Sequence, residues 1–390
     1  MHESEFSQLD ETLRDEGAQA AVDKLIGILR QEGQYHRLFD ALLLKKKAEL
    51  GLPLVRPTSL DDVPEKKRAE FETTSIESAR EIGQILLDEG QIPAAWIYFR
   101  TIQETEPIEK AIEVFDPDND PENQADQIIN IALYEGAHPV RGLELLLRAN
   151  GTCNTITAAD QLMRQLKPTQ RRAAAALLVR QIYSELLQSL NGDIQRRVAM
   201  SPAVETVREA VTGRDWLFEE GNYHIDVSHL HATVRFARAL EPSDDELQLA
   251  CELCEYGRQL TEQFQYDGDP PFDDFYPAHL HYFQILLDQK REEGIDYFRQ
   301  ILERSEDEND QKLTAFVLVD LFLRIDQQDR ALEVARQYLS DWEDPNGFSF
   351  SKLCQDTSRF DELQSAARQR DDLVTYAAAI ISQATPASVG

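Results

Sequence analysis

The sequence predicts an all-α fold made of consecutive antiparallel helix hairpins. Apolar residues recur at intervals of three and four along most of the 390 residues, which is the spacing of one buried helix face. One such run is Leu178, Ile182, Leu186 and Leu190. The strict alternation of apolar and polar residues that marks a half-buried strand is not found. Short breaks separate the periodic stretches: EGQ at 32–34, EGQIP at 89–93, EGAHP at 135–139, REEG at 291–294 and DQQD at 326–329. Two helices joined by so short a break form a hairpin.

These signals divide the chain into four expected regions. They are an N-terminal helical hairpin at 1–54, hairpins at 66–150, an irregular helical centre with a histidine-rich helix start at 151–275, and further hairpins at 276–390. Polar segments that contain proline mark surface loops or boundaries at 55–67, 115–123 and 264–274. In the first region, Leu25, Ile28 and Leu29 form one apolar stripe before the EGQ break, and Phe39, Leu42 and Leu43 form another after it.

The hairpin from Ala79 to Pro107, AREIGQILLDEGQIPAAWIYFRTIQETEP, has the clearest pattern in the chain. Small residues at Gly83 and Ala95 would let its two helices approach closely, and Gly90 would supply the turn. Pro107 is expected to end the second helix. The segment resembles a tetratricopeptide repeat, and the matching residues are Gly83, Leu86, Gly90, Ala95, Phe99 and Pro107. The resemblance implies a right-handed solenoid whose concave surface binds a peptide or helix of a partner protein.

Several later segments resemble weaker copies of the same unit. The first, from Glu135 to Asn150, looks like the turn and second helix of another hairpin. GIDYFRQIL at 294–302 and RALEVARQYL at 330–339 look like second helices of successive hairpins, and another hairpin is expected over 348–381. Residues 151–275 match the repeat pattern least, so the centre of the solenoid is expected to be irregular.

The charge balance restricts the kind of partner. The chain has 40 basic and 71 acidic residues, for a formal charge of −31. This argues against nucleic acid or an anionic membrane as the main partner and permits a basic protein. The longest apolar run, Ala173 to Val179, is far shorter than the ~20 residues that span a bilayer. The acidic N-terminal sequence does not resemble a signal peptide, so we expect a cytoplasmic protein.

Six of the eight histidines fall into three short segments, EGAHP, YHIDVSHLH and PAHLH. Each segment lies at an expected helix start: Pro139 follows His138, either Asp226 or Ser228 can cap the helix that carries His229, and Pro277 precedes His279. The helix dipole disfavours an imidazolium ion at that end. Histidines there should be neutral, which is the form that binds metal ions.

A metal site could combine His224, Asp226 and His229 with His279, or with His138 or His281, around Zn²⁺, Mn²⁺ or Fe²⁺. The spacing argues against a site on one helix, because His229 and His231 would point about 200° apart. The three histidine segments lie on different hairpins, so they would come together only if the hairpins of the centre stack irregularly. The alternative is that these histidines cap helices and pack between hairpins.

Cys251 and Cys254 form a C-x-x-C sequence inside a helical pattern without a second pair. They are expected on a buried helix face rather than in a metal or redox site. No catalytic signature occurs, so no catalytic residue is assigned. The favoured function is a tetratricopeptide-like scaffold that binds a partner protein, and the alternative is a metal-dependent enzyme or small-molecule binder. Residues that could line a binding groove are Trp216, Tyr223, His138 and His281.

Overall fold

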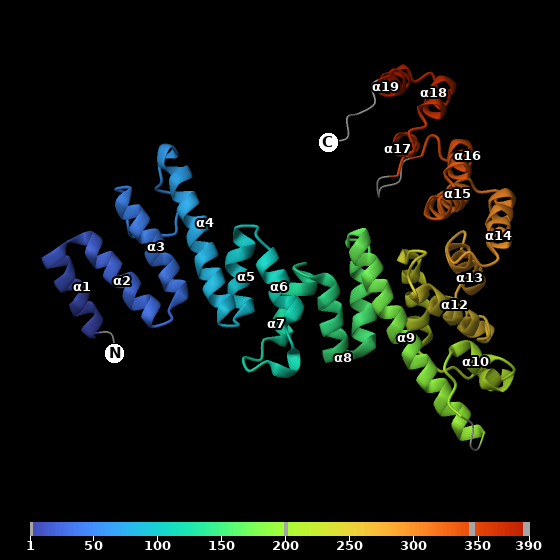
Figure 1. Cartoon of the computed structure of the whole chain (residues 1–390), viewed down its shortest axis with the longest axis horizontal. Coiled ribbons are helices and arrows are strands. Elements are labelled where there is room, and N and C mark those ends of the chain that lie inside the picture. The colour runs from blue at the N-terminus through green and yellow to red at the C-terminus, as the bar shows by residue number, and fades with distance from the viewer. Residues whose placement is uncertain (1–2, 199–201, 343–347, 385–390) are drawn as a thin grey trace. The chain divides into compact units, whose positions relative to one another are not determined.

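The computed structural model describes residues 3–198, 202–342 and 348–384, so the outer ends of the regions expected at 1–54 and 276–390 lie outside the described residues. Within these ranges the regular elements are helices, and an isolated bridge pairs Asp267 with Asp274 (Figure 1). The prediction of an all-α fold is therefore confirmed. The chain divides into two compact units, Met1–Gly151 and Thr152–Gly390.

The helices of the first unit pack mainly against their neighbours in the chain. They are α1 (Glu3–Glu16), α2 (Ala18–Gln31), α3 (Tyr35–Glu49), α4 (Glu65–Asp88), α5 (Ile92–Thr101), α6 (Glu106–Val114) and α7 (Ala125–Ile129), with the short helices η1 (Pro117–Asn119) and η2 (Asn130–Tyr134) and the first part of α8 (Pro139–Leu162). Helical geometry is interrupted inside α8 at Gly151, where φ is +76°. Pro139 begins α8, as the sequence predicts.

The hairpin of α4 and α5 coincides with the segment that resembles a tetratricopeptide repeat. Gly83 lies against Phe99, and a Cβ atom at Gly83 would be 2.7 Å from Cε2 of that ring. Ala95 is fully buried, and Gly90 has a φ of +77° in the turn between the helices. The expected role of Pro107 is wrong: α5 already ends at Thr101, and Pro107 lies in the first turn of α6, where its missing N–H costs nothing.

The second unit is centred on the long helix α9 (Pro168–Arg197), whose residues Leu178, Ile182, Leu186 and Leu190 are fully buried. Around it and after it come α10 (Val207–Val211), η3 (Asp215–Gly221), α11 (Val227–Phe236), η4 (Ala237–Ala239), α12 (Glu246–Gly257), η5 (Glu262–Phe264), α13 (Phe275–Leu286), α14 (Arg291–Arg304), α15 (Glu308–Arg324), α16 (Gln328–Tyr338), α17 (Phe350–Asp356), α18 (Phe360–Gln369) and α19 (Leu373–Ala384). Helix α9 packs against α10, α11 and α12. The centre therefore departs from simple pairing of successive helices.

The C-terminal helices follow the sequence in part. Helices α14 and α16 coincide with the expected segments at 294–302 and 330–339. The expected hairpin at 348–381 is wrong, because three helices, α17, α18 and α19, occupy this segment. The two breaks are at Ser358 and Asp371, which both have positive φ values. A polar residue in the left-handed region ends a helix as glycine would, and neither break contains a glycine that would have marked it.

Cys251 and Cys254 are both buried in α12 and carry free thiols, as expected for a packed helix face. None of the helices in the described ranges combines the length and the apolar character that crossing a bilayer requires.

Candidate functional site

Asp226 caps α11, the helix that begins in the histidine-rich segment. Its Oδ1 atom accepts hydrogen bonds from the backbone N–H groups of Ser228 and His229, at 2.8 and 3.2 Å, and from the Ser228 hydroxyl at 2.5 Å. These bonds lower the pKa of the Asp226 carboxyl, with the Ser228 hydroxyl as the largest contribution. The sequence left open whether Asp226 or Ser228 caps this helix, and in the structure the capping residue is Asp226.

Replacing Asp226 with alanine should lower the free energy of unfolding by about 1 kcal/mol, because two backbone N–H groups lose their acceptor. Ser228→Ala should cost less than about 0.5 kcal/mol, since Asp226 keeps both backbone bonds. Urea denaturation with and without added Zn²⁺, Mn²⁺ or Fe²⁺ measures both effects. A metal-ligand role for Asp226 would instead appear as a metal-dependent stabilisation of the native chain that the alanine variant lacks.

His224 is buried where α9, η3 and α12 meet. Its Nε2 atom lies 3.2 Å from Oδ2 of Asp193, its Nδ1 atom lies 3.3 Å from the Tyr256 hydroxyl, and its backbone N–H donates to that hydroxyl at 2.8 Å. Burial lowers the pKa of His224, although Asp193 opposes the shift. Both ring nitrogens are therefore occupied by protein groups, which is the arrangement of a histidine that joins helices.

Three further histidines pack against aromatic rings. The His279 ring is stacked on Phe272 with centroids 4.3 Å apart, and its Nδ1–H donates to the Phe275 carbonyl at 2.7 Å. The His231 ring lies 3.9 Å from the Phe275 ring, centroid to centroid. His281 is stacked on Tyr297 at 4.5 Å. Burial lowers the pKa of all three imidazoles, that of His231 to about 4.

The structure does not assemble the predicted metal ligands. Across the described ranges, no group of three or more His, Cys, Asp or Glu side chains is placed to hold one ion. His224 contacts Asp193, Asp226 caps its own helix, and His279 bonds to the Phe275 carbonyl. His229 lies half-buried in the first turn of α11. Metal binding by these four residues stays a prediction.

The residues expected to line a binding groove have separate surroundings. Trp216 lies under the Arg197 guanidinium at 5.3 Å, and the half-exposed Tyr223 contacts the edge of Phe264, with ring centroids 5.0 Å apart. His138, in the first unit, has its Nε2 atom 2.8 Å from a carboxylate oxygen of Glu113. None of these residues lines either of the two clefts described below, and neither does His281.

A groove in the first unit lies between α1, α2 and α3, and its volume is about 510 Å³. The apolar residues that line it are Phe6, Leu9, Leu25, Ile28, Leu29, Ala41, Leu44 and Pro57. The charged residues are Glu5, Glu32, Asp40 and Arg37. We call this site the N-terminal groove. Sequence reasoning placed a hairpin here but missed α1, whose exposed Phe6 could have indicated an apolar surface.

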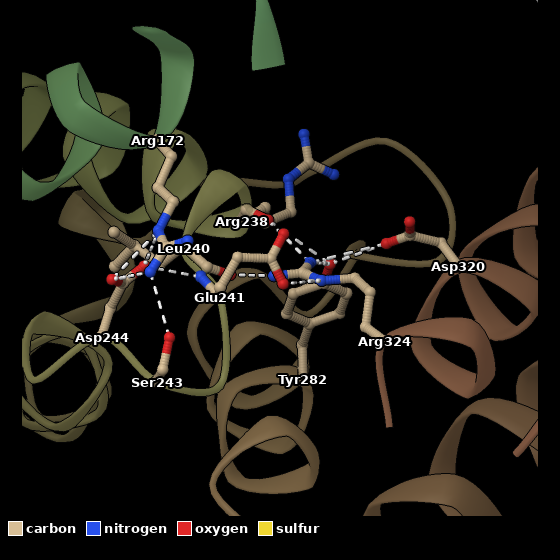
Figure 2. A network of polar contacts seen from close by, with 9 residues as sticks. All are labelled: Arg172, Arg238, Leu240, Glu241, Ser243, Asp244, Tyr282, Asp320 and Arg324. Atoms are coloured by element: carbon tan, nitrogen blue, oxygen red, sulfur yellow. Dashed lines mark hydrogen bonds and ion pairs between the residues drawn. The ribbon is translucent and has the colours of Figure 1, made fainter. Parts of the chain in front are cut away.

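In the second unit, a polar network fixes the loop that follows η4 (Figure 2). The Arg324 guanidinium on α15 donates to the backbone carbonyls of Arg238 and Leu240 and to the Tyr282 hydroxyl. From α9, Arg172 donates to both carboxylate oxygens of Asp244, at 2.6 and 2.8 Å. Two arginines from distant helices therefore hold the same loop.

The chain matches no family model, no curated protein and no solved structure, and its function is therefore inferred from its own clefts and charges.

Proposed function

We propose that the protein is a helical-repeat interaction scaffold, similar in organisation to tetratricopeptide repeat proteins, which binds a basic amphipathic helix of a partner protein in the N-terminal groove. The observation that carries this proposal is an apolar groove between helices with mostly acidic charges around it. Helix-in-groove recognition needs an apolar floor for one face of the bound helix. An acidic rim then selects partners by charge.

The apolar floor can support binding without a rearrangement of the core. Phe6 is 66% exposed on α1, so its ring has apolar surface left to bury. Leu25 and Ile28 are half-buried, one turn apart on α2, and face the same groove. Burying one aromatic or aliphatic side chain on binding stabilises the complex by about 1.5–3 kcal/mol. A few such contacts are sufficient for a specific partner.

The charges around the floor favour a basic partner. Glu5, Glu32 and Asp40 line the groove beside a single arginine, Arg37, and the whole chain carries a formal charge of −31. A positively charged helix would be attracted at long range and held in register at the rim. The negative charge of the rim and of the whole chain disfavours nucleic acid and anionic membranes as ligands of this groove.

The repeat organisation is supported by the close packing of helix pairs. Gly83 allows α4 to approach Phe99 of α5, and Gly294 allows α14 to approach α13, where a Cβ atom would lie 2.8 Å from Ile285. Most helices of the first unit have their main contacts with the helices just before and after them. Each pair has an apolar face that only a neighbour can bury, which is the principle of a solenoid. Such scaffolds act chiefly by binding.

Replacing Phe6 with serine should weaken binding of a basic amphipathic peptide about 10-fold, because the ring would no longer be buried against the peptide's apolar face. The probe is a fluorescein-labelled helical peptide with leucines on one face and lysines on the other. Fluorescence anisotropy with the full chain gives the dissociation constant.

Leu13→Ser is the matched control, since Leu13 is also an exposed apolar residue of α1, at 53%, but lies outside the groove lining. It should change the dissociation constant less than about twofold. Equal affinities of the two variants and the unmodified chain would mean that the peptide adheres elsewhere, and would overturn the assignment of this groove.

A further inference from the structure

A second cleft, within the second unit, is lined by arginines although the protein is strongly acidic. Its volume is about 580 Å³, and it lies between the end of α8, the start of α9, the α11–η4 segment, α13 and α15. Its basic lining residues are Arg164, Arg171, Arg235, Arg238 and Arg324. Its acidic ones are Asp160, Glu241 and Asp320. Positive charge is therefore in excess here, against a formal −31 for the whole chain. We call this site the arginine cleft.

The acidic residues of the cleft are already used by two of the arginines. Arg235 forms an ion pair with Asp160. Arg324 lies 3.6 Å from Glu241 and 3.5 Å from Asp320, nitrogen to oxygen (Figure 2). None of these three carboxylates forms an ion pair with the other three arginines of the lining, although Asp320 and Asp269 attract Arg238 at longer range.

Those three arginines have no ion-pair partner among the residues that the structure describes. Arg171 donates one hydrogen bond, to the Leu166 carbonyl at 3.2 Å. Arg238 donates one weak bond from Nε to the Arg235 carbonyl at 3.4 Å. Arg164 is exposed in the turn that follows α8. The terminal nitrogens of Arg238 make no hydrogen bond in this part of the chain, and Figure 2 shows its guanidinium pointing away from the network around Arg324.

Arg238 is half-buried in the cleft and lies against an aromatic ring. Its guanidinium lies 4.7 Å above the Phe272 ring. Arg235 lies one helical turn before Arg238. Burial lowers the pKa of the guanidinium, and the charge of Arg235 acts in the same direction. Asp320 and Asp269 offset only part of the effect of burial, and a partly desolvated cation without an ion-pair partner destabilises a protein. An anion bound in the cleft would remove this cost.

The chemistry of the lining indicates which anion fits. A planar guanidinium matches phosphate or carboxylate with two parallel hydrogen bonds. A phosphate monoester carries −1.5 to −2 charges and three acceptor oxygens, which suits several unpaired arginines better than one carboxylate does. The lining also includes the apolar residues Met163, Phe236, Phe272 and Phe316. The volume of the cleft is that of sites for small organic ligands.

We propose that the arginine cleft binds a small organic phosphate, with Arg238 and Arg171 holding the phosphate group and the aromatic residues contacting the organic part. This site is separate from the N-terminal groove, and the two proposals stand or fall independently.

Isothermal titration calorimetry of the full chain with phenyl phosphate tests the proposal. Saturable binding with one site is expected, about 10-fold tighter than that of inorganic phosphate, because the ring is also buried. Phenol should not bind measurably. Arg238→Met should weaken phenyl phosphate binding about 10-fold or more through the loss of charge-assisted hydrogen bonds. Arg171→Gln, on α9, should weaken it several-fold.

Arg299→Met is the control, because Arg299 lies on α14 outside the cleft lining; it should leave the affinity within about twofold. Circular dichroism confirms that each variant is folded, and Arg171→Gln keeps the test valid should Arg238→Met unfold. The proposal is overturned by absence of saturable binding, by equal affinity for phenyl phosphate and inorganic phosphate, or by folded variants of both arginines that bind like the unmodified chain.

Discussion

Arg324→Met should lower the free energy of unfolding of the second unit by about 3 kcal/mol. The methionine would fill similar volume, but it has no donor. The carbonyl of Arg238, which accepts from Arg324 at 2.9 Å, and that of Leu240 would both lose their partner. Glu241 and Asp320 would also lose the cation between them. The side chain is only 12% exposed, so water can replace few of these contacts.

Urea denaturation followed by tryptophan fluorescence measures this effect. A Trp96→Phe background removes the tryptophan of the first unit and leaves Trp216 and Trp342 as reporters of the second. Arg304→Met is a suitable control, because Arg304 ends α14 and its side chain donates a long hydrogen bond, 3.4 Å, to Gln300 on the same helix. Its effect should stay below about 0.5 kcal/mol. A loss of less than about 1 kcal/mol for Arg324→Met would show that the network does not hold the loop after η4.

Acid should destabilise the second unit between pH 7 and pH 5, and His231 should account for about 1.5 kcal/mol of the loss after allowance for partial solvent screening. Burial and the neighbouring Arg235 lower the pKa of His231 to about 4, whereas an unfolded histidine has a pKa near 6.5. Below pH 6.5 the unfolded chain binds a proton that the folded chain does not. The stabilisation is complete above this pH and is lost as the pH falls toward 4.

His231→Phe should remove this contribution while it keeps an aromatic ring against Tyr266 and Phe275. Urea denaturation at pH 7.5 and pH 5 gives the difference in free energy of unfolding for each protein. Tyr266→Phe alters the adjacent ring without removing the imidazole, so it should retain the full pH dependence. An unchanged pH dependence in His231→Phe would contradict the account of this buried imidazole.

Local signals in the sequence were sufficient for most of the fold. The apolar stripe of α9 is buried as its spacing predicts, and Gly83 with Phe99 makes the close helix contact expected of the hairpin at 79–107. The hairpin expected at 348–381 has one break, whereas the structure has two, at Ser358 and Asp371. The additional break was missed because a polar residue at positive φ has no distinctive sequence signal.

The histidine cluster shows why a candidate site is harder to predict than a fold. The three segments do begin near helix starts, and Asp226 and Ser228 were both recognised as possible caps. The partners of His224, however, are Asp193 on α9 and Tyr256 on α12, about 30 residues away in either direction. Only the tertiary structure brings these groups together, so spacing within the segment could not identify them.

The arginine cleft was not predicted for the same reason. Its lining comes from α8, α9, α11, α13 and α15, which are spread over more than 160 residues from Asp160 to Arg324. One local signal existed: RFARAL places Arg235 and Arg238 one helical turn apart. Against a net charge of −31, such a pair looks like an ordinary solvated surface.

The most direct test of the proposed scaffold compares two labelled peptides on the full chain by fluorescence anisotropy at low salt. Both have the same leucine face, and lysines in one are replaced by glutamates in the other. If the N-terminal groove binds a basic amphipathic helix, the lysine peptide should bind at least about 10-fold more tightly, and the preference should shrink as salt is added. Equal binding of both peptides, or tighter binding of the glutamate peptide, would contradict the proposal.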